Sequence, residues 1–413
     1  MKKPFHKLFQ NLFCKLFRIL FKGLALIFVL LICGLIIFRF LENRTPPYHH
    51  VSADEMKVLK QFLADQGRNP VDLVIDAFND HPVVILGEPH RIGDHYLFLK
   101  NLIEPLASKG IENIAIEFFL ISNQKDMDEL MSSSVFDEAL ARRIILAPRI
   151  CFYFQELMDI LKEVWKVNRS GKMRVLCLGQ YDIPIPQRKI NTDKRMASII
   201  AREANSGTRT LVYCGNHHAY TKYSQAEFLP WLKPRRQRMG NYLLDGLQQR
   251  GDLQQKPSWT PFYVTFHSPM FKKYYFLIPI LLYDKPFTLP FDGIFDQLFA
   301  TLKEPVAFKS EKLPDWVSES FSYYSIGYGK VPASLYADAY IYLKPMSKCS
   351  FIKPLENLSA SAEERALLKS IHGERLQRLY SSPKTAADLI GSEGITPSDW
   401  ISGMDCGNLD ISL

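Results

Sequence analysis

The sequence predicts an α/β protein with a mostly parallel central sheet flanked by helices, an N-terminal transmembrane helix and a small helical C-terminal extension. Short apolar runs rich in β-branched and aromatic residues alternate with helical patterns, which is typical of crossover βαβ units. An uncharged apolar run at residues 23–38 approaches the roughly 20 residues that a bilayer demands. With 413 residues, 47% of them hydrophobic, the chain is neither a disordered polypeptide nor a small disulfide scaffold.

Residues 1–22 form a basic segment in which apolar side chains recur at the i, i+3, i+4 spacing of one helical face. Two interpretations remain open: a basic amphipathic helix in the cytoplasmic headgroup layer, or a simple extension of the membrane anchor. The apolar residues of this face are Phe5, Leu8, Phe9, Leu12, Phe13, Leu16, Phe17 and Leu20.

The transmembrane anchor is expected over residues 23–41. Six Lys and Arg residues precede Gly23, whereas only Arg39 and Arg44 follow Phe38. The positive-inside rule then places the N-terminus in the cytoplasm and the body in the periplasm or outside the cell. A cleaved signal peptide is the competing interpretation, but the apolar run is long for one and no small-x-small cleavage pattern follows it. Membrane lipid is therefore an expected partner through residues 1–41.

The net charge of +8 does not indicate a nucleic-acid partner, because it is concentrated at the N-terminus. The first 44 residues carry eight basic side chains and one acid, so the rest of the chain has a net charge of only +1. A body this close to neutral lacks the basic surface that binds a phosphate backbone. We expect no nucleic acid among its partners.

Residues 42–70 are expected to form a stem and a leading helix, and residues 71–346 the α/β domain. A helix is expected over 96–106. It is followed by Lys109 and Gly110, a Lys-Gly pair that is common at the end of a helix. The apolar stretch at 274–283 contains Pro279 and is too short to span a bilayer, so it is expected to be a buried strand or a membrane-facing hairpin. Strands are expected at 83–86, 114–118, 175–178, 210–213, 263–266, 275–282 and 339–343.

After Pro345 the sequence changes character, and residues 347–413 are expected to form a helical extension. Ser361 and Glu364 have the spacing of a capping box that opens a charged helix. Nothing in this extension carries recognisable chemistry, which favours a role in packing or as an appendage.

The cysteines do not indicate a metal or redox centre, since no Cys-x-x-Cys pair occurs. Cys177 and Cys214 lie within expected strands and are predicted to be buried thiols. Whether Cys349 and Cys406 form a bridge is left open by the sequence.

Two segments resemble each other and carry the most reactive side chains. In residues 83–90 and 210–218, an apolar strand runs directly into a Gly-x-x-His sequence, ending at His90 and His218. Parallel strands place such residues at the same carboxyl edge, where α/β sheets bind ligands. Glu88 and Glu117 are expected at this edge as well, Glu117 at the end of its strand. A polar residue just past a strand is often only a cap, but a buried carboxylate such as Glu117 is costly unless it is paired.

The order of these motifs resembles the superfamily that unites erythromycin esterases, ChaN-like haem-binding lipoproteins and Tiki/TraB proteins. The resemblance covers roughly residues 75–345. It rests on Gly87-Glu88-Pro89-His90, the strand with Glu117, Asp193-Lys194-Arg195-Met196-Ala197, Gly215-Asn216-His217-His218 and the closing strand at 336–342.

Two departures from the family pattern bear on the site. The esterases carry an Arg before the Asp of the Met-Ala helix, where this chain has Thr192, so Arg195 or Arg188 would have to supply the positive charge. His95, with the preceding Asp94, is similar to the ChaN-like subgroup rather than to the esterases.

The resemblance implies hydrolysis of an ester or amide bond in a small-molecule or peptide substrate. It assigns catalytic roles to Glu88, His90, Glu117 and His218, with Arg195 as the cation. Without metal, a carboxylate-held His removes a proton from water, and an Arg or the second His stabilises the oxyanion. With a divalent metal, His90, Glu117 and His218 are the ligands and Glu88 is the base. The family contains both kinds, so this choice stays open.

Two alternatives to hydrolysis remain at this stage. One is a ChaN-like haem or iron binder without catalysis, in which His95 or one of the tyrosines contacts the cofactor. The other is an inactive scaffold of the same fold. The residues do not identify the substrate.

Overall fold

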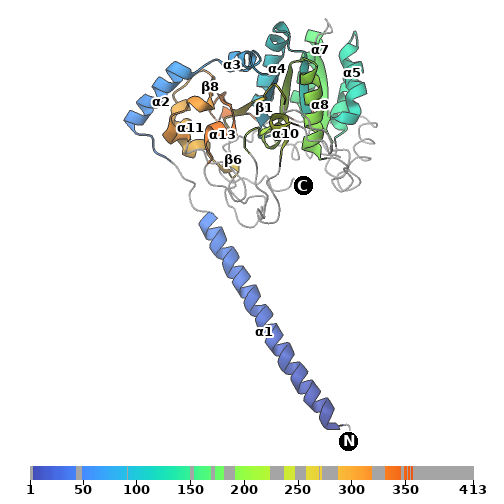
Figure 1. Cartoon of the computed structure of the whole chain (residues 1–413), viewed down its shortest axis with the longest axis vertical. Coiled ribbons are helices and arrows are strands. Elements are labelled where there is room, and N and C mark those ends of the chain that lie inside the picture. The colour runs from blue at the N-terminus through green and yellow to red at the C-terminus, as the bar shows by residue number, and fades with distance from the viewer. Residues whose placement is uncertain are drawn as a thin grey trace.

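The computed structural model shows a layered α/β domain and a long N-terminal helix (Figure 1). The residues that it describes are 3–42, 49–90, 92–148, 153–168, 173–180, 191–223, 237–246, 257–268, 270–271, 287–318, 331–345, 348–350, 352–353 and 355–356. The apolar stretch at 274–283, Cys406, Arg188 and the capping box of Ser361 and Glu364 lie outside the described residues, as does most of the C-terminal extension.

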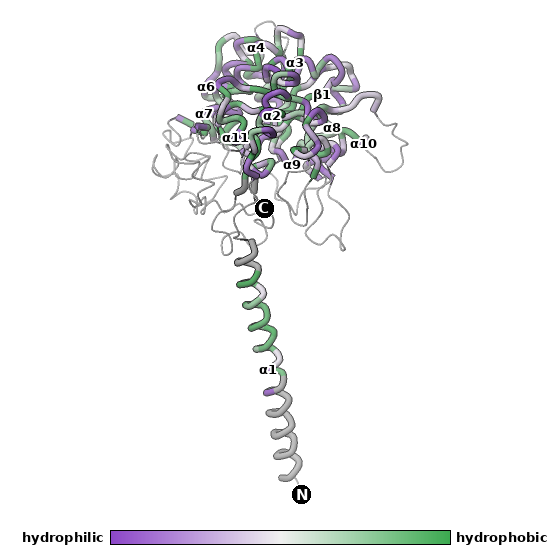
Figure 2. Tube along the Cα trace, turned by 90° about the vertical axis from the view of Figure 1, so that its left-hand side faces the viewer, coloured by the Kyte–Doolittle hydropathy of each residue, from purple (hydrophilic) through white to green (hydrophobic). Residues whose placement is uncertain are grey.

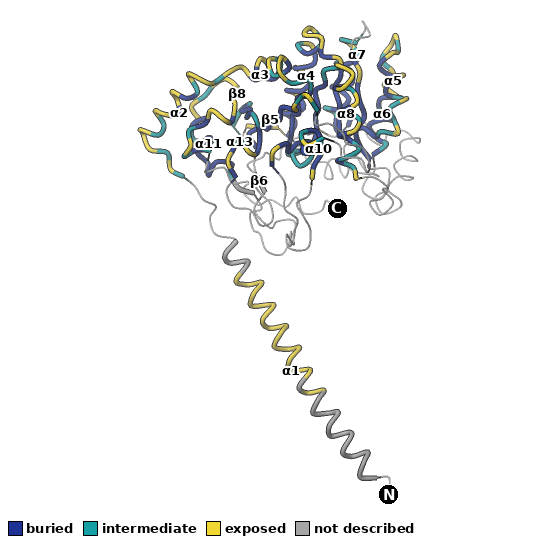
Figure 3. The backbone as a smooth tube through the Cα atoms, in the orientation of Figure 1, coloured by how far each residue is buried: buried dark blue, intermediate teal, exposed yellow. Residues whose placement is uncertain are grey.

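Helix α1 (Lys3–Glu42) is one uninterrupted helix that includes both the basic segment and the expected anchor. Its window Leu20–Ile37 has a mean hydropathy of 2.8 and no buried residue, as the exposed colouring of α1 in Figure 3 shows. Among the described residues this is the single helix long and apolar enough to cross a membrane. A signal sequence near the N-terminus can also meet this threshold of length and hydropathy. The side chains before Phe17, which carry the proposed amphipathic face, lie outside the described residues.

The described residues resume at His49. The next helices are α2 (Ala53–Gln66) and α3 (Pro70–Ala77). Ser52 caps α2 in a capping box with Glu55, in which each side chain bonds to the backbone N–H of the other residue. This cap explains why the helix begins directly after Ser52.

The central sheet has seven strands in the order β3-β2-β4-β1-β5-β9-β8. All neighbouring strands are parallel except β8, which is antiparallel to β9. The prediction of a mostly parallel sheet is confirmed. The edge strand β8 was not predicted, since its four residues have no clear β pattern. The strand bounds are β1 Val83–Glu88, β2 Asn113–Leu120, β3 Arg174–Gly179, β4 Thr210–Gly215, β5 Phe262–Phe266, β8 Val306–Lys309 and β9 Ala339–Tyr342.

Helices cover both faces of this sheet, as expected for crossover connections. One face packs against α3, α4 (Gly93–Ser108), α5 (Gln124–Ser132), α6 (Glu138–Leu146) and α7 (Gln155–Val167). The other packs against α2, α8 (Thr192–Asn205), α10 (Met239–Asp245), α11 (Ile294–Phe299) and α13 (Ala333–Tyr336). The short elements are η1 Ile121–Asn123, α9 Asn216–Ala219, β6 Met270–Phe271, β7 Phe287–Thr288, η4 Pro290–Gly293, η5 Ser310–Lys312 and α12 Asp315–Ser318.

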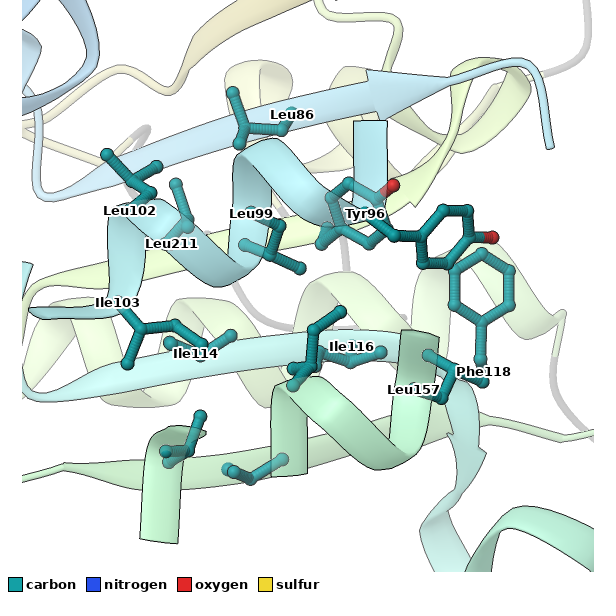
Figure 4. Close-up of a cluster of buried hydrophobic side chains, with 14 of the residues drawn as sticks. Leu86, Tyr96, Leu99, Leu102, Ile103, Ile114, Ile116, Phe118, Leu157 and Leu211 are labelled. Atoms are coloured by element: carbon teal, nitrogen blue, oxygen red, sulfur yellow. The ribbon is translucent and has the colours of Figure 1, made fainter. Parts of the chain in front are cut away.

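The core lies on both sides of the sheet because successive strand residues point to opposite faces. Figure 4 shows the face on which Leu86, Ile114 and Leu211 of three neighbouring strands meet Leu99 and Leu102 of α4. Figure 2 shows that hydrophobic and hydrophilic residues alternate along the chain within the domain, whereas the apolar residues of α1 form one continuous stretch. Packing on both faces holds the strands in place. It therefore fixes the positions of the side chains at their carboxyl ends.

Buried thiols were predicted at Cys177 and Cys214, and both are free cysteines inside the core. Cys349 is also a buried free thiol. Cys406, the other cysteine of the bridge that the sequence left open, lies outside the described residues.

Candidate active site

The first pair of site residues, Glu88 and His90, lies at the carboxyl end of β1. Glu88 is fully buried, and its Oε2 accepts the backbone N–H of His90 at 2.6 Å. Its other oxygen, Oε1, contacts His90 Nδ1. These bonds hold His90 in the left-handed region, at a φ of 65°, which is uncommon for a residue with a side chain. The His90 side chain is 37% exposed, so the imidazole is fixed by a buried carboxylate but reaches the surface.

Glu117 lies on the neighbouring part of the edge, in β2. The expectation that Glu117 ends its strand is wrong, because β2 continues to Leu120. The register between β2 and β3 shifts between Ile116 and Leu120, and β2 pairs with β4 only as far as Ile116. This irregularity leaves Glu117 beside the end of β4, where its Oε2 accepts the backbone N–H of Gly215 at 2.7 Å.

His218 lies between two carboxylates. It belongs to the short helix α9, directly after β4. Its Nδ1 is 2.6 Å from Asp193 Oδ1, and its Nε2 is 3.3 Å from Glu117 Oε1. The buried Glu117 therefore has the cationic partner that its burial demands.

Asp193 is a site residue that the sequence did not single out beyond its place in the family motif. It is buried in the first turn of α8, where Asn191 caps the helix. Its Oδ1 also accepts the backbone N–H of Met239 at 3.0 Å, and its Oδ2 lies 3.7 Å from the guanidinium of Arg238. The sequence signal was an Asp just after an Asn cap, which is usually read only as a favourable helix start.

The charges of these groups are set by their mutual contacts. Burial alone lowers the pKa of His218, but Glu117 and Asp193 outweigh it and raise the pKa to about 10. Burial raises the pKa of Asp193, yet His218 and Arg238 overcome this and hold it below its ordinary value. The site thus keeps an imidazolium at neutral pH.

The Glu88–His90 pair has a different balance. Burial raises the pKa of Glu88, although His90 opposes this rise. Burial lowers the pKa of His90, but Glu88 and then Glu117 raise it above the ordinary value. Two carboxylate–histidine pairs in different surroundings suit different proton-transfer roles.

Two glycines allow these groups to approach one another. A Cβ on Gly215 would lie 2.7 Å from His90 Cε1 and 3.5 Å from Glu117 Oε2. A Cβ on Gly87 would lie 2.7 Å from Asn216 Oδ1, which accepts hydrogen bonds from the hydroxyls of Tyr263 and Thr265. The glycine of each Gly-x-x-His sequence therefore leaves room for a polar side chain of the other sequence, Gly215 for His90 and Gly87 for Asn216.

The structure brings together four of the six residues singled out from the sequence: Glu88, His90, Glu117 and His218. Arg195 lies in α8 near the end of β3. With the side-chain oxygen of Gln180 turned toward it, Arg195 donates two hydrogen bonds to this oxygen, from Nη1 at 2.7 Å and from Nε at 3.1 Å. Within the described part of the chain, Arg195 bonds to Gln180 rather than to any of the four residues. Arg238, which the sequence did not indicate, is the guanidinium next to Asp193.

His95 does not join this group. It is buried in α4, and its ring stacks on Phe266 with the ring centres 4.3 Å apart. Burial, together with nearby His267, lowers the pKa of His95 to about 3, so it is a neutral core residue. Its neighbour Asp94 binds Lys344 and the backbone N–H of Ser350, which fastens the segment after β9 onto α4.

The trio His90, Glu117 and His218 was the expected ligand set of a metal-assisted site. Among the residues that the structure describes, no group of three or more His, Cys, Asp and Glu side chains is arranged to hold a metal ion. Both ring nitrogens of His218 face carboxylates, so a metal at Nε2 would have to replace its contact with Glu117.

Comparison with known proteins shows distant similarity of fold. An erythromycin esterase mutant in its open conformation is 11% identical, with a TM-score of 0.41, and the match covers 73% of this chain and 94% of that one. A succinoglycan biosynthesis protein is 12% identical, with a TM-score of 0.39, and the match covers 76% and 96%. A haem-binding ChaN of Campylobacter jejuni is 13% identical, with a TM-score of 0.31, over 50% and 88%.

No family model matches the chain, and no curated protein matches it. The similarity to solved structures therefore concerns the fold and assigns the chain to no single family.

Proposed function

We propose that this protein is a membrane-anchored hydrolase of carboxylic esters or amides, working without metal. The observation that carries the proposal is the pair of histidines whose Nδ1 atoms contact the buried carboxylates Glu88 and Asp193, with Glu117 between them. A carboxylate at Nδ1 orients an imidazole and leaves Nε2 for the reacting atoms.

His90 is the general base in its neutral form, and because its pKa is raised this form becomes more abundant as the pH increases. Glu88 holds the proton on Nδ1, so Nε2 takes a proton from water as the water oxygen forms a bond to the substrate carbonyl carbon. The tetrahedral intermediate then collapses, and the leaving oxygen or nitrogen receives that proton from His90. The products are a carboxylic acid and an alcohol or amine, and His90 is neutral again.

His218 is the oxyanion stabiliser. As an imidazolium, it donates a charge-assisted hydrogen bond from Nε2 to the developing negative oxygen. In the resting site this nitrogen faces Glu117 at 3.3 Å, a long contact that a shorter bond to the oxyanion can replace. Asp193 and, behind it, Arg238 hold the imidazolium in place.

The metal-assisted mechanism is the weaker proposal because a metal ligand must be a neutral imidazole, whereas Glu117 and Asp193 keep His218 protonated. Haem binding through His95 is the weaker alternative, since this ring is buried in the core and stacks on Phe266. An inactive scaffold is the outcome if the reaction below is not observed.

The location proposed for the protein follows from α1. We propose that α1 spans the membrane with the N-terminus in the cytoplasm and the domain in the periplasm or outside the cell. The apolar window Leu20–Ile37 and the excess of basic residues before it support this orientation.

The test uses the full chain in detergent micelles with 4-methylumbelliferyl butyrate and a butyryl anilide. We expect hydrolysis of at least one substrate that survives exhaustive chelation and is lost in His90→Gln and His218→Gln. His81→Gln, at a partly exposed histidine that precedes β1 and so lies at the amino edge of the sheet, is the matched control and should retain full activity. Activity that disappears with chelation and returns with zinc would transfer the proposal to the metal-assisted mechanism. Activity in neither condition would contradict it.

A further inference from the structure

We propose that the site faces the bilayer and takes its ester substrate from the membrane, so that the substrate class is a long-chain acyl lipid. The inference rests on the proposed function and on three features of the described residues: where the chain arriving from α1 is fastened, how long its connection is, and which edge of the sheet holds the site.

The chain that arrives from α1 is fastened to α11 and η4. His49 N–H donates to the carbonyl of Asp292 at 2.9 Å, and the Gln297 amide donates to the carbonyl of His49 at 2.7 Å. Gln297 also accepts the N–H of Val51. These bonds fix the start of the domain to one position.

That position is close to the carboxyl edge of the sheet. Asp296, the residue before Gln297, lies 3.3 Å from His267 Nε2, and His267 directly follows the last residue of β5. The carbonyl of Phe299, at the end of α11, accepts the hydroxyl of Tyr342, the last residue of β9. Helix α11 therefore contacts residues at the carboxyl ends of two strands.

The site lies along this same edge. β5 is the direct neighbour of β1, whose end carries Glu88, and β4 follows on the far side of β1. Neighbouring strands are about 4.8 Å apart, so the end of β5 is roughly 5–10 Å from the ends that carry the two histidine motifs. Figure 1 shows β6, which follows β5 at this edge, on the side of the domain toward α1.

The connection to α1 is too short to let the domain move far from the bilayer. Residues 43–48 separate Glu42 from His49, and this number of residues spans at most about 25 Å when fully extended. A site held this near a membrane meets lipid at a high local concentration, whereas a water-soluble substrate gains nothing from the anchor.

The experiment compares two esters of one fluorophore, with the full chain reconstituted in phosphatidylcholine vesicles. 4-Methylumbelliferyl oleate resides in the bilayer and 4-methylumbelliferyl butyrate dissolves in water. A flexible insert of about 30 Gly and Ser residues between Arg44 and Thr45 lengthens the connection about sixfold. Because local concentration falls with roughly the −3/2 power of linker length, we expect oleate hydrolysis to fall about tenfold and butyrate hydrolysis to stay unchanged.

The matched control carries the same insert at Gly207, in the exposed turn between α8 and β4 at the opposite edge of the sheet. It should hydrolyse both esters like the parent chain. Equal rates on oleate with and without the insert at residue 44, together with intact butyrate hydrolysis, would overturn the membrane-facing site and leave the hydrolase proposal standing. If the parent chain hydrolyses neither ester, the proposed function itself is refuted.

Discussion

His218 and Asp193 form a 2.6 Å contact between two helices that follow different strands, α9 after β4 and α8 after β3. The carboxylate is buried in the first turn of α8, and a further backbone N–H and a guanidinium hold it from the side of α10. The imidazole depends on this support for both its orientation and its charge. A histidine held in this way is ready to donate a proton or a hydrogen bond, but not to accept a proton at neutral pH.

Replacing Asp193 by Asn should reduce hydrolysis at least 100-fold, because it removes a charge that raises the pKa of His218 and keeps Nε2 as a donor. Steady-state kinetics with the butyrate ester measures the loss, and NMR titration of the histidines should show the pKa of His218 falling. Asp54→Asn is the matched control, since Asp54 is an exposed Asp in the first turn of α2. Unchanged turnover in Asp193→Asn would remove Asp193 from the proposed machinery.

Replacing Glu117 by Gln should abolish activity while the melting temperature stays within a few degrees of the parent value. A Gln can still accept the Gly215 N–H through its carbonyl oxygen, but it has no charge for His218. Glu112→Gln, at the other end of β2, is the control: Glu112 is exposed and also accepts a backbone N–H, that of Arg209. If Glu117→Gln unfolds the domain instead, its role is structural, since breaking a buried ion pair costs about 3–5 kcal/mol.

The raised pKa of His218 predicts a loss of stability in alkaline solution. Its pKa is about 10 in the folded state against 6.5 in the unfolded chain, so the folded state binds the extra proton between these values. This contribution is complete below pH 6.5 and is lost as pH rises to about 10, with a slope of up to about 1.4 kcal/mol per pH unit. Urea unfolding from pH 6 to 10 should show this decline, and His218→Gln should reduce it. Parallel curves for the two proteins would contradict the charged state assigned to His218.

Replacing Gly215 by Ala should displace His90 and lower hydrolysis by at least tenfold. The added methyl would lie 2.7 Å from the His90 ring, closer than side chains tolerate. Gly34→Ala adds the same methyl group in α1 where nothing lies within 4 Å, and it should leave the rate unchanged. Equal activity in both variants would mean that His90 has another productive position.

The proposed topology predicts that a reporter fused after Leu413 is active only on the non-cytoplasmic side of the membrane. Alkaline phosphatase, which needs an oxidising compartment, should be active in this fusion, and a cytoplasm-dependent fluorescent protein should not. The reverse pattern would refute the orientation. Release of the domain as a soluble fragment with a new N-terminus would show that α1 is a cleaved signal sequence.

The sequence by itself determined the sheet and four members of the site. Apolar β-rich runs are local signals, so strands such as β1 and β4 were located within one or two residues of their bounds. Glu88, His90, Glu117 and His218 were placed at one edge because parallel strands share their direction, and the structure brings them together there.

Only the tertiary structure decided how these residues are paired. Asp193 supports His218 from a different crossover unit, Arg238 rather than Arg195 is the guanidinium next to Asp193, and His95 lies in the core rather than at the edge. The edge strand β8 also escaped prediction, since its pairing with β9 comes from its place in the sheet. Such contacts depend on how α8, α9 and α10 pack over the sheet. The spacing of residues along the chain does not indicate which side chains this packing brings into contact.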